Sequence, residues 1–318
     1  MRSFVITLVV AAFLVCFSTI TVGQTPSNAI NLYKHGTSKL NKNDLDGAIE
    51  DFTKAIELSS RLGPAKADNG SRFRNDLTTE AEAANITVID PLTANAYSNR
   101  GVARMRKRDF EGAIQDFSRA IRIRPNQAEP YLNRCAARRA VGDQTGALAD
   151  AEKAISLNNE MYQAYNNRAS VRFELGDYKG AHNDLNRAIE LNPKIVEHFC
   201  NRGFVLVHLG DLEAALQDFN EAIKLNAEIA QPYQGRATAW MKKAKYDEAI
   251  ADLTRAIELD PTEPTSYMNR GLSLTVKGRD TEAKKDFDKC LELSPALKAE
   301  LEQKIPIARN IRYALIND

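Results

Sequence analysis

The chain has 318 residues, of which 43% are hydrophobic and 27% charged, as in a folded soluble protein. Lys and Arg total 43 against 42 Asp and Glu, and this net charge of +1 argues against nucleic acid as a partner. The cysteines, at Cys16, Cys135, Cys200 and Cys290, have no short spacing and indicate neither a disulfide framework nor a zinc site.

The N-terminal segment, residues 1–23, is typical of a secretory signal peptide. Arg2 precedes an apolar run from Phe4 to Phe17, and small residues follow up to Gly23, where we expect the cleavage. The run is shorter than the roughly twenty apolar residues that span a membrane. Counted to Val22, however, it leaves an uncleaved N-terminal membrane anchor as the alternative. Both interpretations predict an exported protein: periplasmic, secreted or anchored at the outer side of a membrane.

Most of the remaining chain repeats with a period of 34 residues. An alanine that opens an amphipathic stretch recurs at Ala113, Ala147, Ala181, Ala215, Ala249 and Ala283. An earlier copy at Ala48 lies one period plus 31 residues before Ala113. A fixed period of this length is the signature of stacked structural repeats.

Further columns of the repeat predict closely packed helix pairs. Small residues recur twelve positions before each marker alanine, at Gly36, Gly101, Cys135, Ala169, Gly203, Ala237 and Gly271. An aromatic residue stands sixteen positions before six of the seven markers, and Leu32 takes that place in the first copy. Small residues allow antiparallel helices to approach, and larger side chains fill the space between them.

Turn residues divide each repeat into two helices. We expect Gly142, Gly176 and Gly210 to end first helices in a left-handed conformation. Aspartates at the next position should cap the second helices, at Asp109, Asp143, Asp177 and Asp211.

Together these columns resemble the tetratricopeptide repeat. The resemblance implies an all-α fold, a right-handed superhelical solenoid of antiparallel helix pairs whose concave groove binds peptides or protein segments. The expected organisation is a linker and first divergent repeat (24–62), a largely loop-like insert (63–93), six contiguous repeats (94–297) and a C-terminal capping helix (298–318) that Pro306 breaks or kinks.

One column of asparagines is the main candidate for binding. It consists of Asn99, Asn133, Asn167, Asn201 and Asn269, and it is interrupted by Gly235 and, in the first repeat, by Lys34. It resembles the asparagine ladder in the repeat domain of O-GlcNAc transferases, which holds the backbone of an extended peptide. An amide donates and accepts together, so a row of amides can pair with peptide groups. The alternative is that each amide bonds to neighbouring helices of its own chain.

Two charged columns predict structural ion pairs. The arginines are Arg100, Arg134, Arg168, Arg202, Arg236 and Arg270, and the aspartates are Asp116, Asp150, Asp184, Asp218, Asp252 and Asp286. Each repeat that carries the Arg also carries the Asp. We expect a fork-shaped contact between a first helix and an adjacent second helix, which would fix how repeats stack.

Apolar residues complete the predicted groove. Phe173, Phe204, Met241 and Met268 are candidates for pockets that receive a partner's side chains, with packing between repeats as the alternative. Cys135 and Cys290 fall in small-residue columns and should be buried, whereas Cys200 lies on the expected groove and is the candidate for an exposed thiol.

The sequence contains no recognisable catalytic motif, and we expect neither enzymatic activity nor a cofactor or metal. The favoured function is an exported scaffold that mediates protein–protein interaction by binding an extended peptide or protein segment in its groove. The alternative is a structural or assembly factor of the cell envelope that acts through self-association or its convex face. The partner and the oligomeric state are left open.

Overall fold

The structure, a computed structural model, describes residues 27–60 and 91–317, in which every regular element is a helix. The predicted signal or anchor segment and nearly all of the predicted insert lie outside these residues. Among the helices described, none combines the length and the apolar character needed to cross a bilayer. The chain divides into two compact units, Met1–Val171 and Arg172–Asp318.

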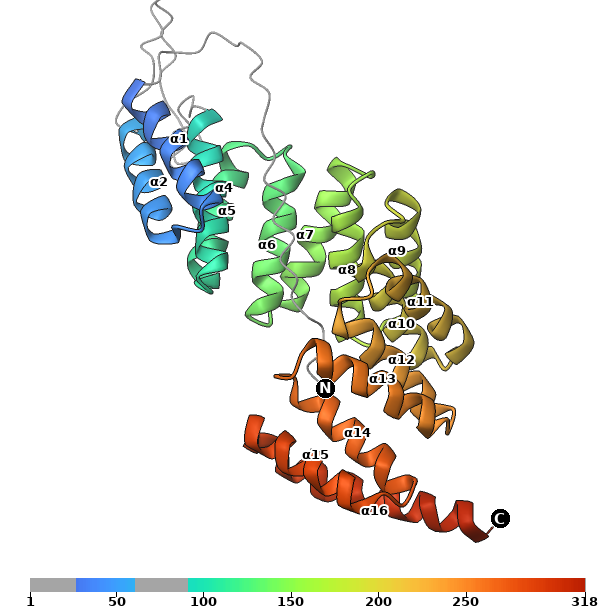
Figure 1. The fold of residues 1–318 in the computed structure, drawn as a ribbon. Coiled ribbons are helices and arrows are strands. Elements are labelled where there is room, and N and C mark those ends of the chain that lie inside the picture. Colours follow the sequence, from blue (N-terminus) through green and yellow to red (C-terminus); the bar gives the residue numbers. More distant parts are fainter. Residues whose placement is uncertain (1–26, 61–90, 318) are drawn as a thin grey trace, which may run out of the picture. The chain divides into compact units, whose positions relative to one another are not determined.

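The first unit consists of antiparallel helix pairs (Figure 1). Its helices are α1 (Ser27–Asn41), α2 (Leu45–Ser60), α4 (Pro91–Arg106), α5 (Phe110–Ile123), α6 (Ala128–Ala140), α7 (Gln144–Leu157) and most of α8 (Tyr162–Glu174). Helix α1 packs on α2, α4 on α5 and α6 on α7, and the second helices α2 and α5 also pack on the first helices that follow them, α4 and α6. The first helices α1, α4 and α6 are in contact in that order, so they form one layer.

Within the second unit the helices are arranged in the same way. It holds the end of α8, α9 (Tyr178–Leu191), α10 (Val196–Leu209), α11 (Leu212–Leu225), α12 (Ala230–Lys242), α13 (Tyr246–Leu259), α14 (Pro264–Val276), α15 (Asp280–Leu293), the short η1 (Pro295–Leu297) and α16 (Lys298–Asn317). First helices α10, α12 and α14 are again in contact in order, and α16 packs on α14. Helix α16 therefore covers the last of these first helices.

The turns inside the repeats share one backbone conformation. A residue with positive φ, between 57° and 84°, ends every turn at the same repeat position: Asn43, Arg108, Gly142, Gly176, Gly210, Ala244 and Gly278. The predicted left-handed glycines are thus confirmed, and three repeats use a residue other than glycine there. The next residue caps the second helix: Asp109, Asp143, Asp177 and Asp211 each accept a hydrogen bond from a backbone N–H three residues later.

The volumes of two facing side chains are matched inside the repeats. Phe117 and Phe219 are fully buried, and their rings lie so close to Gly101 and Gly203 that a Cβ there would meet ring carbons at 2.7 Å. Where the second helix carries the smaller Leu253, the facing residue is Ala237. The small residues of the first helices therefore make room for the large side chains that face them on the second helices.

The start of α4 and the course of α16 differ from those expected. Residues 91–93, assigned from sequence to the insert, form the first turn of α4, which begins at Pro91. Proline suits this position because the first N–H groups of a helix have no partner within it. Helix α16 continues through Pro306, so of the predicted break or kink at this proline the break does not occur. Pro306 is exposed, and the carbonyl it leaves without an intrahelical donor belongs to Glu302, which is also exposed to water.

Candidate functional site

A row of guanidinium–carboxylate pairs organises the repeats. In five of them the arginine Nε and one terminal nitrogen donate to both oxygens of the aspartate in the same repeat, at 2.6–2.9 Å. The pairs are Arg100–Asp116, Arg134–Asp150, Arg202–Asp218, Arg236–Asp252 and Arg270–Asp286. The pair of Arg168 with Asp184 stays a prediction. The five aspartates are buried, so the pairs belong to the interior of the protein.

The other terminal nitrogen of each guanidinium reaches the preceding repeat. It donates to a side-chain oxygen of the previous second helix, on Thr53, Ser118, Asn186, Asn220 and Thr254 in turn. Sequence inspection missed this column because its members share only an oxygen acceptor, and not a residue type. The arginines therefore bind within one repeat and across to the one before, which agrees with a role in stacking.

The bond from Arg100 to Thr53 has a particular consequence. Thr53 lies on α2 and Arg100 on α4, on opposite sides of the segment 61–90, and the distance is 2.8 Å. The first two repeats thus stack in the same register as those that follow one another directly in the chain.

A second cation holds the aspartate in the earlier repeats. Arg104, Arg138 and Arg172 each approach the aspartate of their own repeat at 2.7–2.9 Å. In the first repeat, where His35 replaces the usual arginine, Lys39 lies 2.8 Å from Asp51. The recurrence of arginine at this position in three consecutive repeats was a signal that sequence inspection could have used.

Each column arginine also lies over the aromatic residue one turn earlier. The distances from the guanidinium carbon to the ring centroid are 5.4–5.9 Å for Arg100, Arg134, Arg168, Arg202, Arg236 and Arg270. The pKa of Arg236 is raised mainly by its hydrogen bond to Asp252, and the pKa of Arg270 mainly by its hydrogen bond to Asp286. These arginines are permanently charged and fully engaged, which leaves them little capacity to bind a ligand.

The candidate asparagines fall into two groups. Asn99 donates to the hydroxyl of Tyr33 at 3.1 Å, which ties α4 to α1, and Asn201 is buried. Asn133, Asn167 and Asn269 are half-buried, and within the described residues their amides make no hydrogen bond. The three are therefore free to bind an external peptide group.

At the interruption of the column, Gly235 lies against the ring of Phe219. A Cβ at this position would meet the ring of Phe219 at 2.2 Å, closer than any side chain tolerates. A side chain at position 235 would therefore require the ring of Phe219 to shift.

The predicted apolar groove residues are largely engaged in packing. Met268 is 3% exposed in the core of the second unit. Phe204 packs edge-on against Phe219 at 5.2 Å between ring centroids, and Phe173 makes edge contacts with Tyr178 and His208. Met241, in contrast, lines a pocket.

The expectation of an exposed thiol at Cys200 is wrong. Cys200 is fully buried, and burial is the main cause that raises its pKa to about 12. It packs with Phe199 and Ala222, and Ile189 on α9 lies against the same cluster. Cys135 and Cys290 are buried as predicted.

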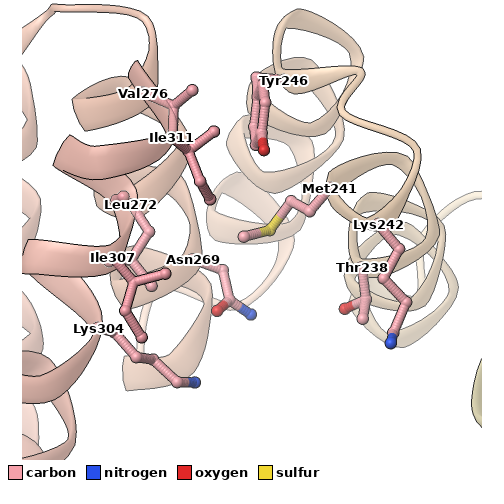
Figure 2. A pocket seen from close by; sticks show the side chains of 11 residues that line it. Thr238, Met241, Lys242, Tyr246, Asn269, Leu272, Val276, Lys304, Ile307 and Ile311 are labelled. Carbon is pink, nitrogen blue, oxygen red and sulfur yellow. The ribbon is translucent and has the colours of Figure 1, made fainter. Parts of the chain in front are cut away.

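The pocket at Met241 lies where α12, α13, α14 and α16 meet. It has a volume of about 320 Å³. Figure 2 shows its lining side chains, and the residues are Thr238, Met241, Lys242, Tyr246, Asn269, Leu272, Val276, Lys304, Ile307, Ala308 and Ile311. One of the free asparagines, Asn269, thus lies beside an apolar cavity. Within the described residues, no cluster of His, Cys, Asp and Glu is suited to hold a metal ion.

Comparison with known families agrees with this architecture. Models described as tetratricopeptide repeat match residues 29–61, 94–127, 162–195, 185–217 and 264–297, and a model described as TPR repeat matches 239–278. Together they cover more than half of the chain, which belongs to the tetratricopeptide repeat family. Such proteins are generally non-enzymatic scaffolds, and the fold is consistent with protein–protein interaction. No curated protein sequence matches the chain significantly.

Solved structures share the fold at low identity. A tetratricopeptide repeat protein from Parabacteroides merdae is 19% identical with a TM-score of 0.64, and the match covers 88% of this chain and 98% of that one. PilF of Pseudomonas aeruginosa is 19% identical with a TM-score of 0.58, over 66% of this chain and 95% of its own. A thermophilic repeat protein from Thermus thermophilus reaches 0.50 at 19% identity, covering 57% and 98%.

Proposed function

We propose that this protein is an exported scaffold that mediates protein–protein interaction by binding an extended peptide or protein segment along its first helices. The observation that carries this proposal is the state of Asn133, Asn167 and Asn269, whose amides are accessible and make no hydrogen bond to described residues. An amide fixed on a rigid helix can donate to a peptide carbonyl and accept from a peptide N–H at once. Such binding depends on backbone groups and so tolerates many side chains.

Export is the part of this proposal that rests on sequence alone. Residues 1–23 carry the features of a signal peptide or an N-terminal anchor. Fractionation of cells that express the tagged chain tests it: the protein should be found outside the cytoplasm, and deletion of residues 2–23 should retain it inside.

The binding proposal is tested by a pull-down with the full chain and the double variant Asn133→Ala, Asn167→Ala. Since these amides make no hydrogen bond to described residues, the variant should fold normally while specific partners are lost. The matched control is Asn99→Ala, which removes an amide already used by Tyr33 and should retain the partners. Equal recovery of the partners by the double variant and by the native protein would overturn the proposal.

A second candidate function, assembly through self-association, is favoured by the last helix. End caps of repeat arrays are normally polar on their outer side. Helix α16 instead exposes four large apolar residues, Ile307, Tyr313, Leu315 and Ile316, at 57–70%. Light scattering of the native protein and of Ile316→Asp tests this alternative: an oligomer that dissociates in the variant supports it, and a monomeric native protein contradicts it.

A further inference from the structure

The pocket beside Asn269 has chemistry that restricts what a bound segment can present to it. Its apolar wall comes from three helices: Met241 on α12, Leu272 and Val276 on α14, and Ile307 and Ile311 on α16. Burial raises the pKa of Tyr246, which lines the same cavity. At about 320 Å³ the cavity can receive one bulky aliphatic or aromatic side chain.

One edge of the pocket is polar and positive. Figure 2 shows the polar ends of Lys304, Asn269, Thr238 and Lys242 along one side, and the apolar groups of Leu272, Val276 and Ile311 on the other. No carboxylate is among the lining residues, all of which belong to the described part of the chain.

The charge of this edge is only partly neutralised. Lys304 pairs with Glu300 at 2.7 Å, whereas Lys242 makes no ion pair within residues 27–60 and 91–317. The pKa of His208 is lowered, mainly by burial and secondly by the positive charge of Lys242. A carboxylate of a bound ligand would therefore be attracted to this edge, and a cationic group would be repelled.

We infer that this pocket selects a partner segment in which a bulky apolar side chain is accompanied by Asp or Glu within one or two residues. The apolar side chain enters the cavity, the Asn269 amide holds a neighbouring peptide group, and Lys242 with Lys304 attracts the carboxylate. The inference rests on the proposed function and adds a sequence preference to it. The amides are tolerant of side chains, so this preference has to come from the pocket.

The test begins with selection of a phage-displayed library of random twelve-residue peptides on the full chain. Enriched peptides are synthesised with amidated C-termini, which removes the terminal carboxylate as a source of negative charge, and their affinity is measured by fluorescence anisotropy. We expect enrichment of an apolar residue with a nearby acidic one. Replacement of either residue in the peptide by Ala should weaken binding by at least about tenfold. Enrichment of basic sequences, or of none, would overturn the inference.

Matched variants locate the binding. Ile307→Asp changes the apolar wall at a residue that is 58% exposed, and Ile316→Asp makes the same change on the same helix outside the pocket. Lys242→Glu reverses the charge at the edge, and Lys285→Glu does so at an exposed position on α15. The two pocket variants should lower peptide affinity by at least about tenfold, and the two controls should not. Equal affinity of all four variants would refute the assignment.

The failure of this inference can be told apart from the failure of the proposed function. If the native partners are lost from the Asn133→Ala, Asn167→Ala variant but retained by Ile307→Asp, the amides bind peptide and the pocket sets no preference. If both variants retain the partners, both proposals fail. Loss of the partners from both variants supports both the proposed function and the preference set by the pocket.

Discussion

The guanidinium of Arg202 and the carboxylate of Asp218 form two parallel hydrogen bonds, from Nε at 2.8 Å and from a terminal nitrogen at 2.7 Å. Asp218 is 5% exposed and pairs with no other cation of the described chain. Asp150 is equally buried, but it is held by Arg138 as well as by Arg134. The two aspartates therefore differ in what remains when the column arginine is removed.

This difference predicts unequal effects of the same substitution. Arg202→Ala leaves a buried charge without a partner and should lower the free energy of unfolding by about 3 kcal/mol. Arg134→Ala should cost about half as much, because Arg138 still neutralises Asp150. Urea denaturation followed by circular dichroism measures both. Equal losses would show that the second arginine has no compensating effect.

The contact of Gly203 with Phe219 predicts a coupled pair of substitutions. Gly203→Ala should destabilise the protein by about 2 kcal/mol, because the Phe219 ring is fully buried and cannot retreat toward Gly235. Phe219→Leu alone should cost about 1 kcal/mol through the space it leaves. The double variant recreates the combination found at Ala237 and Leu253. It should be more stable than the sum of the single losses predicts, and strict additivity in denaturant titrations would contradict this.

Ala244 predicts a stabilising substitution. Its φ is +57°, a conformation that costs an L-residue about 1 kcal/mol or more, and other repeats place glycine at the same position. The side chain is exposed, so Ala244→Gly loses no packing. After subtraction of the greater freedom of glycine in the unfolded chain, we expect a gain of about 0.5 kcal/mol. A higher thermal midpoint by calorimetry supports this, and a lower one refutes it.

His198 predicts a dependence of stability on pH. It is 2% exposed, and burial lowers its pKa from 6.5 to about 4. As the pH falls below 6.5 the unfolded chain takes up a proton at this residue, whereas the folded protein does so only near pH 4. The folded state should therefore lose about 2 kcal/mol between pH 7.5 and pH 5 through this group.

The control for this prediction is His198→Gln, which does not titrate in that range. Its stability should fall less between pH 7.5 and pH 5 than that of the native protein, measured by urea denaturation at both values. Parallel losses in the two proteins would assign the pH dependence to other groups.

Cys200 should be chemically inert in the folded protein. A thiol with a pKa of about 12 is protonated at pH 8, and the thiolate is the reactive form. Iodoacetamide at pH 8 should leave Cys200 unmodified in the native state and modify it in guanidinium chloride, as read by mass spectrometry of the peptide. Rapid modification of the native protein would contradict the burial.

The helical fold could be predicted from sequence because its causes recur every 34 residues. The left-handed glycine followed by a capping aspartate, as at Gly176 and Asp177, carries its structural meaning in the residue type itself. The arginine and aspartate columns were likewise visible, since both partners recur together.

Other features could not be predicted because they depend on the neighbours that the fold supplies. Ser118 and Asn186 accept the same kind of hydrogen bond in successive interfaces, yet no shared residue type marks them. Cys200 and Asn201 lie in columns that elsewhere have more exposed members, and their burial follows from local packing. The pocket beside Asn269 exists because α16 packs on α14, which no column of the repeat encodes.

The bonds that cross from one repeat to the next require little of the residue they reach. The guanidinium needs one oxygen acceptor on the preceding second helix, and threonine, serine and asparagine all satisfy it. Among the described residues, four of the five glycines that lie against a phenylalanine ring belong to the same helix pair as that phenylalanine. A gene for such a protein can therefore gain or lose a whole unit of 34 codons and still encode compatible junctions. A half-unit change would separate each phenylalanine from the glycine that makes room for it.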